Sequence, residues 1–416
     1  MLLNLVFLPL TIRNIGLDRF GVLTAILALI NIFLVIDLGA TNSLMTQFAK
    51  EFSSKESIKV NELLTNSFIL ILAWLTLLFV FASIFFRSIF RKELPEFILD
   101  LKLDSVNGLI LYWLISLTMI ANVAGRLLFG MNLESRAYKV SLIINSLAPV
   151  AVYISSFSGS VMLMISAQLS CSIIVGGGVL TYILFVSKEV RLEIRLVQKK
   201  LLLGVLKNGS LYQYLQLFAV INAQIFPLYA LFAFGDAQAG MLTAILKVCS
   251  FPITLIGFAT LPLWVSASKE VHKENASLLY FFKHQFVESF AISMLFAMVF
   301  GLAGQRIMEF VIGEQSTRIT TNLILSACAF TVVLGVSQPL SNILNGAGSL
   351  RFLYLVNPTL FLVSLACIFS FEKNLAESAI FLGLAAANLF VFLLPGLVYL
   401  HRSSRNRFKH RFNALS

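Results

Sequence analysis

The sequence has 416 residues, of which 58% are hydrophobic and only 12% are charged, and its mean hydropathy is +0.90. Soluble domains carry about 25% charged residues, so this composition excludes an ordinary soluble protein and leaves little chain for a soluble domain. The formal net charge is +11 at pH 7, and the four cysteines are scattered through apolar stretches without metal-ligand spacing. We therefore expect no disulfide, no metal and no cofactor.

Apolar runs of about 20 residues, long enough to cross a hydrocarbon core of about 30 Å, recur along the whole chain. They predict eleven membrane-spanning helices, at 20–37, 66–86, 107–126, 138–157, 160–186, 210–234, 239–263, 286–304, 319–339, 350–370 and 377–400. A further stretch, Met1–Ile12, is short, so either translation begins upstream of Met1 or this helix starts part-way into the bilayer. The sequence predicts an all-α polytopic membrane protein with about 12 transmembrane helices.

Lysine and arginine are distributed unevenly between the loops on the two sides of these spans. The richer set includes six basic residues between Lys188 and Lys207 and five after His401. The positive-inside rule therefore predicts a cytoplasmic C-terminus. The net charge follows from this topology, so we expect the basic tail to touch anionic lipid headgroups and expect no nucleic-acid partner.

One phrase occurs twice: GVLTAIL begins at Gly21, and GMLTAIL begins at Gly240. With an offset of 219, residues 16–51 align without gaps on 235–270, and twelve of 36 positions are identical. The two copies lie six spans apart, which returns the chain to the same side of the membrane. This pattern indicates parallel repeats related by a pseudo-twofold axis along the membrane normal.

The duplication predicts four regions: an N-terminal six-helix bundle at 1–187, a basic cytoplasmic linker at 188–209, a C-terminal six-helix bundle at 210–400 and a basic cytoplasmic tail at 401–416. A weaker echo relates 129–138 to 345–354. Two facing bundles would leave a central cleft, and rocking one against the other would give alternating access. The sequence therefore favours a transporter.

Lys247 is the most informative polar residue, because it lies about 12 Å into a span that begins at the predicted outer face. A charge in hydrocarbon costs at least about 2.5 kcal/mol at the centre of the bilayer. A lysine that faces a wet cleft would attract an anionic substrate group. The alternative is that Lys247 pairs with an acidic residue elsewhere, although the spans hold few acids.

Nine further polar residues in or beside the spans are candidates for the same cleft: Arg13, Asp37, Asn122, Arg126, Asn222, Gln224, Gln338, Asn342 and Arg351. The arginines could instead anchor helix ends at the membrane interfaces by snorkelling. Asp37 could cap a new segment that starts near Thr41. The amides could form hydrogen bonds between helices rather than line a cleft.

Three motifs resemble those of a known family. They are RNIGLDRFG at 13–21, IDLGATNSL at 36–44 and TLPLWVSASKE at 260–270, in this order and spacing. With them, the chain resembles the oligosaccharide (O-antigen-type) flippase branch of the multidrug/oligosaccharidyl-lipid/polysaccharide exporter superfamily. Two features depart from many relatives: Val265 follows Trp264 where they have proline, and the first helix is short.

The resemblance implies a MATE-like fold and the export of a polyprenyl-diphosphate-linked oligosaccharide across the bacterial cytoplasmic membrane, for O-antigen or capsule biosynthesis. It implies as partners a lipid-linked oligosaccharide, membrane lipids and other membrane proteins of polysaccharide assembly. Lys247 fits the diphosphate physically. Some related antiporters place acids in the first and seventh helices, and neither segment has one here, so the sequence does not indicate ion coupling by a buried carboxylate.

Two alternatives remain open at the level of sequence. A MATE-type multidrug or small-solute antiporter would share the fold, but cation export calls for carboxylates in the cleft, where only Asp37 and Glu288 come near. A membrane glycan polymerase or ligase would need catalytic groups in an outer loop, yet the loop at 87–106 has no histidine. Because no nucleophile, phosphate-loop or metal motif stands out, we expect no enzymatic activity.

Overall fold

A computed structural model of the chain describes residues 2–37, 41, 57–89, 105–131, 133–186, 190–260, 263, 267, 278–347, 349–375 and 377–402. These residues form helices joined by turns, and no strand occurs among them. Within these helices the side chains of some residues, Arg351 among them, lie outside the described part.

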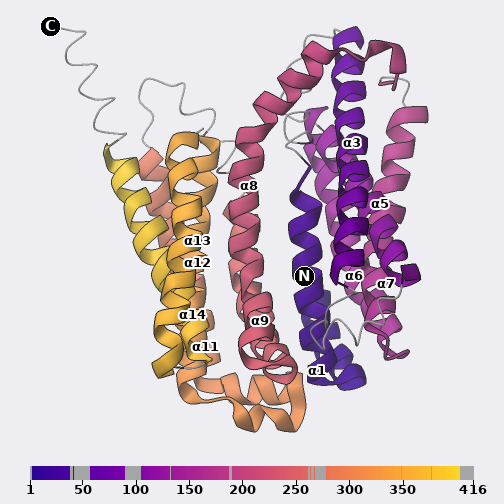
Figure 1. Ribbon diagram of the computed structural model, residues 1–416. Helices are drawn as coiled ribbons and strands as arrows, with labels where there is room; N and C mark the ends of the chain where they lie inside the picture. Colours follow the sequence, from indigo (N-terminus) through magenta and orange to yellow (C-terminus); the bar gives the residue numbers. More distant parts are fainter. Residues whose placement is uncertain are drawn as a thin grey trace, which may run out of the picture. The chain divides into compact units, whose positions relative to one another are not determined.

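Long helices follow one another along the chain (Figure 1). In chain order, the α-helices and the short 3-10 or π-helical segments, labelled η, are α1 (Leu2–Val35), α3 (Ser57–Ile89), α5 (Ser105–Gly130), α6 (Glu134–Ser156), α7 (Val161–Thr181), η1 (Tyr182–Val186), η2 (Ile194–Leu196), α8 (Lys199–Phe234), α9 (Asp236–Thr260), α11 (Leu278–Ile312), η3 (Gly313–Arg318), α12 (Thr321–Gly346), α13 (Leu350–Leu375), α14 (Ser378–Ala387) and η4 (Asn388–Leu393).

Eleven described segments are long and apolar enough to cross a membrane. A helix satisfies its backbone hydrogen bonds internally, so it is the form that an apolar chain takes in lipid. The predicted all-α, multi-pass membrane architecture is confirmed. The predicted spans match these segments, except that the short first stretch and the first full span form the two arms of α1.

α1 breaks at Gly16, whose φ of 82° and ψ of 163° interrupt two helical arms. The residue 219 positions later, Gly235, ends α8 with a φ of 81° and ψ of 177° before α9 begins. L-residues with a side chain rarely adopt a positive φ of this kind, so glycine is required at both turns. The two glycines of the repeat therefore perform the same structural task.

Helix boundaries repeat in another part of the chain. α5 runs from residue 105 to 130 and α12 from 321 to 346, while α6 begins at 134 and α13 at 350. All three positions recur after 216 residues. This recurrence extends the internal duplication beyond the letters that the two copies share.

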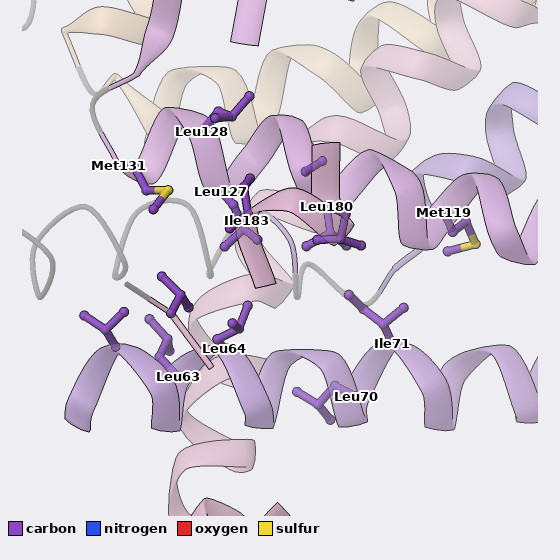
Figure 2. Close-up of a cluster of buried hydrophobic side chains, with 14 of the residues drawn as sticks. Leu63, Leu64, Leu70, Ile71, Met119, Leu127, Leu128, Met131, Leu180 and Ile183 are labelled. Atoms are coloured by element: carbon purple, nitrogen blue, oxygen red, sulfur yellow. The ribbon is translucent and has the colours of Figure 1, made fainter. Parts of the chain in front are cut away.

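The chain divides into two compact units, the first made of residues 1–220 and 227–240, the second of residues 221–226 and 241–416. The first unit has a core of leucine, isoleucine, valine and methionine side chains from α3, α5, α7 and η1, part of which is labelled in Figure 2. In the second unit, the Phe381 ring of α14 packs against Phe226 of α8 and Phe330 of α12, with ring centroids 4.9 and 5.6 Å apart. These cores fix the helices that carry the polar residues.

The segment that leads into α8 is fastened to α3 by polar side chains. Asn66 is fully buried, donates to the carbonyls of Glu62 (2.7 Å) and Leu196 (3.0 Å), and accepts from the backbone N–H of Gln198 at 3.0 Å. The Thr65 hydroxyl accepts from the backbone N–H of Glu193 at 3.1 Å. Part of the basic linker is therefore held against the first unit by side chains that supply its backbone hydrogen bonds.

Candidate functional site

Gly21 and Gly240, the first residues of the two copies of the phrase, lie where α1 and α9 cross. A Cβ atom on Gly21 would overlap the backbone carbonyl of Asp236 and lie 2.7 Å from the backbone nitrogen of Gly240. A Cβ atom on Gly240 would overlap the carbonyl of Leu17, the residue that matches Asp236 in the repeat. Small residues allow helix backbones to approach this closely, so α1 and α9 meet through a self-similar glycine contact inside the first unit.

Lys247 lies two turns after Gly240, near the middle of α9. It is the twelfth of 25 residues, about 16 Å from the start of the helix at 1.5 Å per residue. Its side chain is exposed, while Thr243, one turn earlier, is buried. An exposed ammonium at this depth is tolerated where water or an anion reaches it, and it is costly against lipid tails.

Asp37 and Arg126 were separate candidates, and the structure brings them together. Asp37 lies just after the end of α1, is only 6% exposed, and accepts hydrogen bonds from the backbone N–H of Thr41 at 3.2 Å and from the Thr41 hydroxyl. Arg126, half-buried in α5, is close enough to the Asp37 carboxylate for the opposite charges to attract. Asp37 therefore acts both as the predicted cap and as a counter-charge.

The end of α1 receives further polar contacts. Val35 is the last residue of α1, and its carbonyl, which lacks a partner within the helix, accepts from the Gln213 side chain of α8 at 3.0 Å. Asn122 lies one turn before Arg126 and is exposed. Gln213 was not among the sequence candidates, because a glutamine close to residue 210, where a span was predicted to begin, gives no signal of what it will contact.

The equivalent place in the second unit is found 216 positions later. There Gln338 corresponds to Asn122, and Asn342 corresponds to Arg126. The Asn342 amide donates to the Thr260 hydroxyl at 2.9 Å, and this hydroxyl donates to the Ile256 carbonyl at 2.8 Å. The oxygen of Gln338 lies beside Gly257 of α9. Here an uncharged chain of hydrogen bonds joins α12 to α9, whereas the first unit has a pair of opposite charges.

The other candidates are placed as follows. Asn222 accepts from the Ser364 hydroxyl at 3.2 Å, and Ser364 is fully buried, so this amide joins α8 to α13. Gln224 is half-buried on α8, and Arg13 is exposed on α1. Arg351 belongs to α13, but its side chain lies outside the described residues.

The fold is similar to that of several solved transporters. A multidrug resistance MATE family transporter of the MOP superfamily in its inward-facing conformation matches with a TM-score of 0.79 at 16% identity, over 98% of this chain and 95% of that one. The outward-facing conformation of such a transporter matches with a TM-score of 0.65 at 15% identity, over 98% and 96%. The chain has the MATE fold.

A third match is a MOP superfamily transporter from Pyrococcus furiosus, described as having a reversed polarity of its binding pocket that suggests a different function. It has a TM-score of 0.64 and 14% identity over 98% of this chain and 95% of that one. No protein-family model and no curated protein matches the chain. At these identities the similarity establishes the fold, and the cargo has to be argued from the residues.

Proposed function

We propose that the chain exports a polyprenyl-diphosphate-linked oligosaccharide across the bacterial cytoplasmic membrane by alternating access, for the synthesis of a surface polysaccharide. The bundles at 1–187 and 210–400 are the bodies that move, and the C-terminus is cytoplasmic. The MATE fold supports a transporter, because its neighbours include inward-facing and outward-facing forms. The three motifs that resemble oligosaccharide flippases support the cargo.

The exposed side chain of Lys247, near the middle of α9, is the observation that carries this proposal. A diphosphate is a compact, strongly charged anion, and lysine binds it as a point charge with three donors. The polyprenyl chain needs no such site, since the membrane already solvates it. Lys247 therefore suits the charged part of the cargo, which is the part that hydrocarbon rejects most strongly.

The two acids that the sequence offered for a cationic cargo, Asp37 and Glu288, do not favour one. The Asp37 carboxylate is buried, accepts hydrogen bonds from Thr41 and is attracted by the positive charge of Arg126. Oε1 of Glu288 lies 3.4 Å from Nδ1 of His284, and both side chains are exposed. A MATE-type multidrug antiporter is still compatible with the fold, and it is the second candidate.

Replacing Lys247 tests the proposal. We expect Lys247→Ala to abolish export of surface glycan, because the diphosphate loses its counter-charge, and Lys247→Arg to retain a large part of it. Leu255→Ala is the matched control, since Leu255 is an exposed residue two turns further along the same helix. The measurement is surface glycan per cell at equal amounts of inserted protein.

Normal export by Lys247→Ala would remove the site. A wild-type chain that lowers drug accumulation in cells and leaves surface glycan unchanged would favour the multidrug antiporter instead.

A further inference from the structure

A cavity of about 770 Å³ lies inside the first unit, and none of its lining residues is a site candidate discussed above. Its walls come from the residues after the break in α1, the start of α5, the turn between α6 and α7, and the first residue of α9. The lysine and arginine distribution predicts that this end of the helices is extracytoplasmic. The volume falls in the range of about 300–1,000 Å³ that is typical of ligand pockets.

The walls are rich in hydrogen-bonding groups. Asp18 and Arg19 follow the turn at Gly16, Asp236 opens α9, and the Asn107 amide and the Ser166 hydroxyl come from α5 and α7. The carboxylates of Asp18 and Asp236 lie in the first turn of a helical arm, where the helix dipole favours negative charge. The cavity therefore presents acceptors and donors from four separate helices.

The charge of the cavity disfavours a phosphate group as its ligand. One guanidinium and two carboxylates line it, and Arg19 donates to the carbonyl of Gly159 at 3.1 Å. The wall is thus net negative and would repel the diphosphate that we assign to Lys247. The ligand that it fits carries many hydroxyls and no negative charge.

Apolar side chains complete the cavity. Ile110, Met162 and Leu163 line it together with the polar groups. A sugar ring has hydroxyls around its edge and C–H groups on its faces, so it needs both kinds of contact, whereas a metal ion would need neither this volume nor the apolar wall.

We propose that this cavity is a glycan subsite, which binds uncharged sugar residues of the lipid-linked oligosaccharide at the outer end of the first unit. The inference rests on the proposed function, because it divides the cargo between two places. Lys247 takes the diphosphate, and the cavity takes the sugars. Binding the sugars there would hold the glycan at the outer end of the first unit.

Photo-crosslinking in whole cells tests the subsite. p-Benzoylphenylalanine replaces Met162 in the full chain, cells are fed a radioactive sugar, and labelled adducts are counted after irradiation. The same probe at Phe251, one turn from Lys247, reports passage of the cargo past the lysine. The probe at Leu142, which is 63% exposed on α6, controls for random capture of lipid.

We expect a labelled adduct at position 162 that disappears in cells lacking the transferase that starts lipid-linked glycan synthesis. Adding Asp18→Asn and Ser166→Val should weaken it about fivefold, as expected for the loss of one or two hydrogen bonds. An adduct at 251 but not at 162 would overturn the subsite and leave the export function intact. Adducts at neither position would overturn both, and an adduct at 162 in cells without lipid-linked glycan would exclude this cargo as the occupant.

Discussion

The same place in the duplicated fold is charged in one unit and neutral in the other. In the first unit, Arg126 of α5 lies near the buried Asp37 at the end of α1. In the second, Asn342 of α12 donates to Thr260 at the end of α9. The helices involved correspond in the repeat, α1 and α5 in the first unit and α9 and α12 in the second, so a polar contact at this place does not require charge. The two copies therefore keep a polar contact between corresponding helices and differ in its charge.

The largest expected effect separates these two places directly. Arg126→Ala removes the positive charge that attracts the buried Asp37 carboxylate, which should lower the free energy of unfolding by up to about 3 kcal/mol. Asn342→Ala removes one interhelix hydrogen bond and should cost about 0.6 kcal/mol, the average for such bonds in membranes. Both losses are measured as changes in the free energy of unfolding in detergent micelles. Equal losses in the two variants would mean that Arg126 and Asp37 do not act as a pair.

The glycine contact gives a second, smaller test. Gly240→Ala places a Cβ against the carbonyl of Leu17, and Gly21→Ala places one against the carbonyl of Asp236. Each substitution should lower the free energy of unfolding by about 1–3 kcal/mol. Gly125→Ala is the matched control, because a Cβ there meets no atom within 4 Å and alanine favours the helix by about 0.5–1 kcal/mol. Thermal unfolding of the purified variants compares them. A stable Gly240→Ala protein would contradict the close crossing of α1 and α9.

The smallest effect is expected when the first unit is made neutral like the second. Asp37→Asn combined with Arg126→Gln removes both charges at once, and such double replacement of a buried pair is often close to neutral in stability. The free energy of unfolding of the double variant should therefore be closer to the wild-type value than that of Arg126→Ala. A loss equal to the sum of the single variants would show that the two residues act independently.

The helices were predictable from the sequence because the membrane requires them. Every backbone group in the bilayer core must be satisfied internally, so hydropathy alone marks the spans. The turns at Gly16 and Gly235 fall in gaps that were predicted between neighbouring spans, but a break at either glycine was not predicted. Which faces of the helices meet does not follow in the same way.

Contacts between helices are harder to predict, because a leucine that faces lipid and a leucine that faces another helix are equally apolar. Leu302 is 85% exposed and Leu242 is fully buried, yet hydropathy scores them alike. The sequence placed Asn222 correctly in a span and left two interpretations open, and its bond to Ser364 is seen only in the structure. The neighbourhood of Asp37 and Arg126 and the docking of the linker on Asn66 were missed for the same reason.

The central claim is that this chain moves a lipid-linked glycan between leaflets, and the leaflet on which that lipid accumulates tests it most directly. In cells without the chain, spheroplasts treated with an impermeant probe of the glycan should show the lipid-linked oligosaccharide increased in amount and shielded from the probe, on the cytoplasmic side. Restoring the wild-type chain should expose it, and restoring Lys247→Ala should not. Lipid-linked oligosaccharide that reaches the outer leaflet normally in cells without the chain would contradict the account.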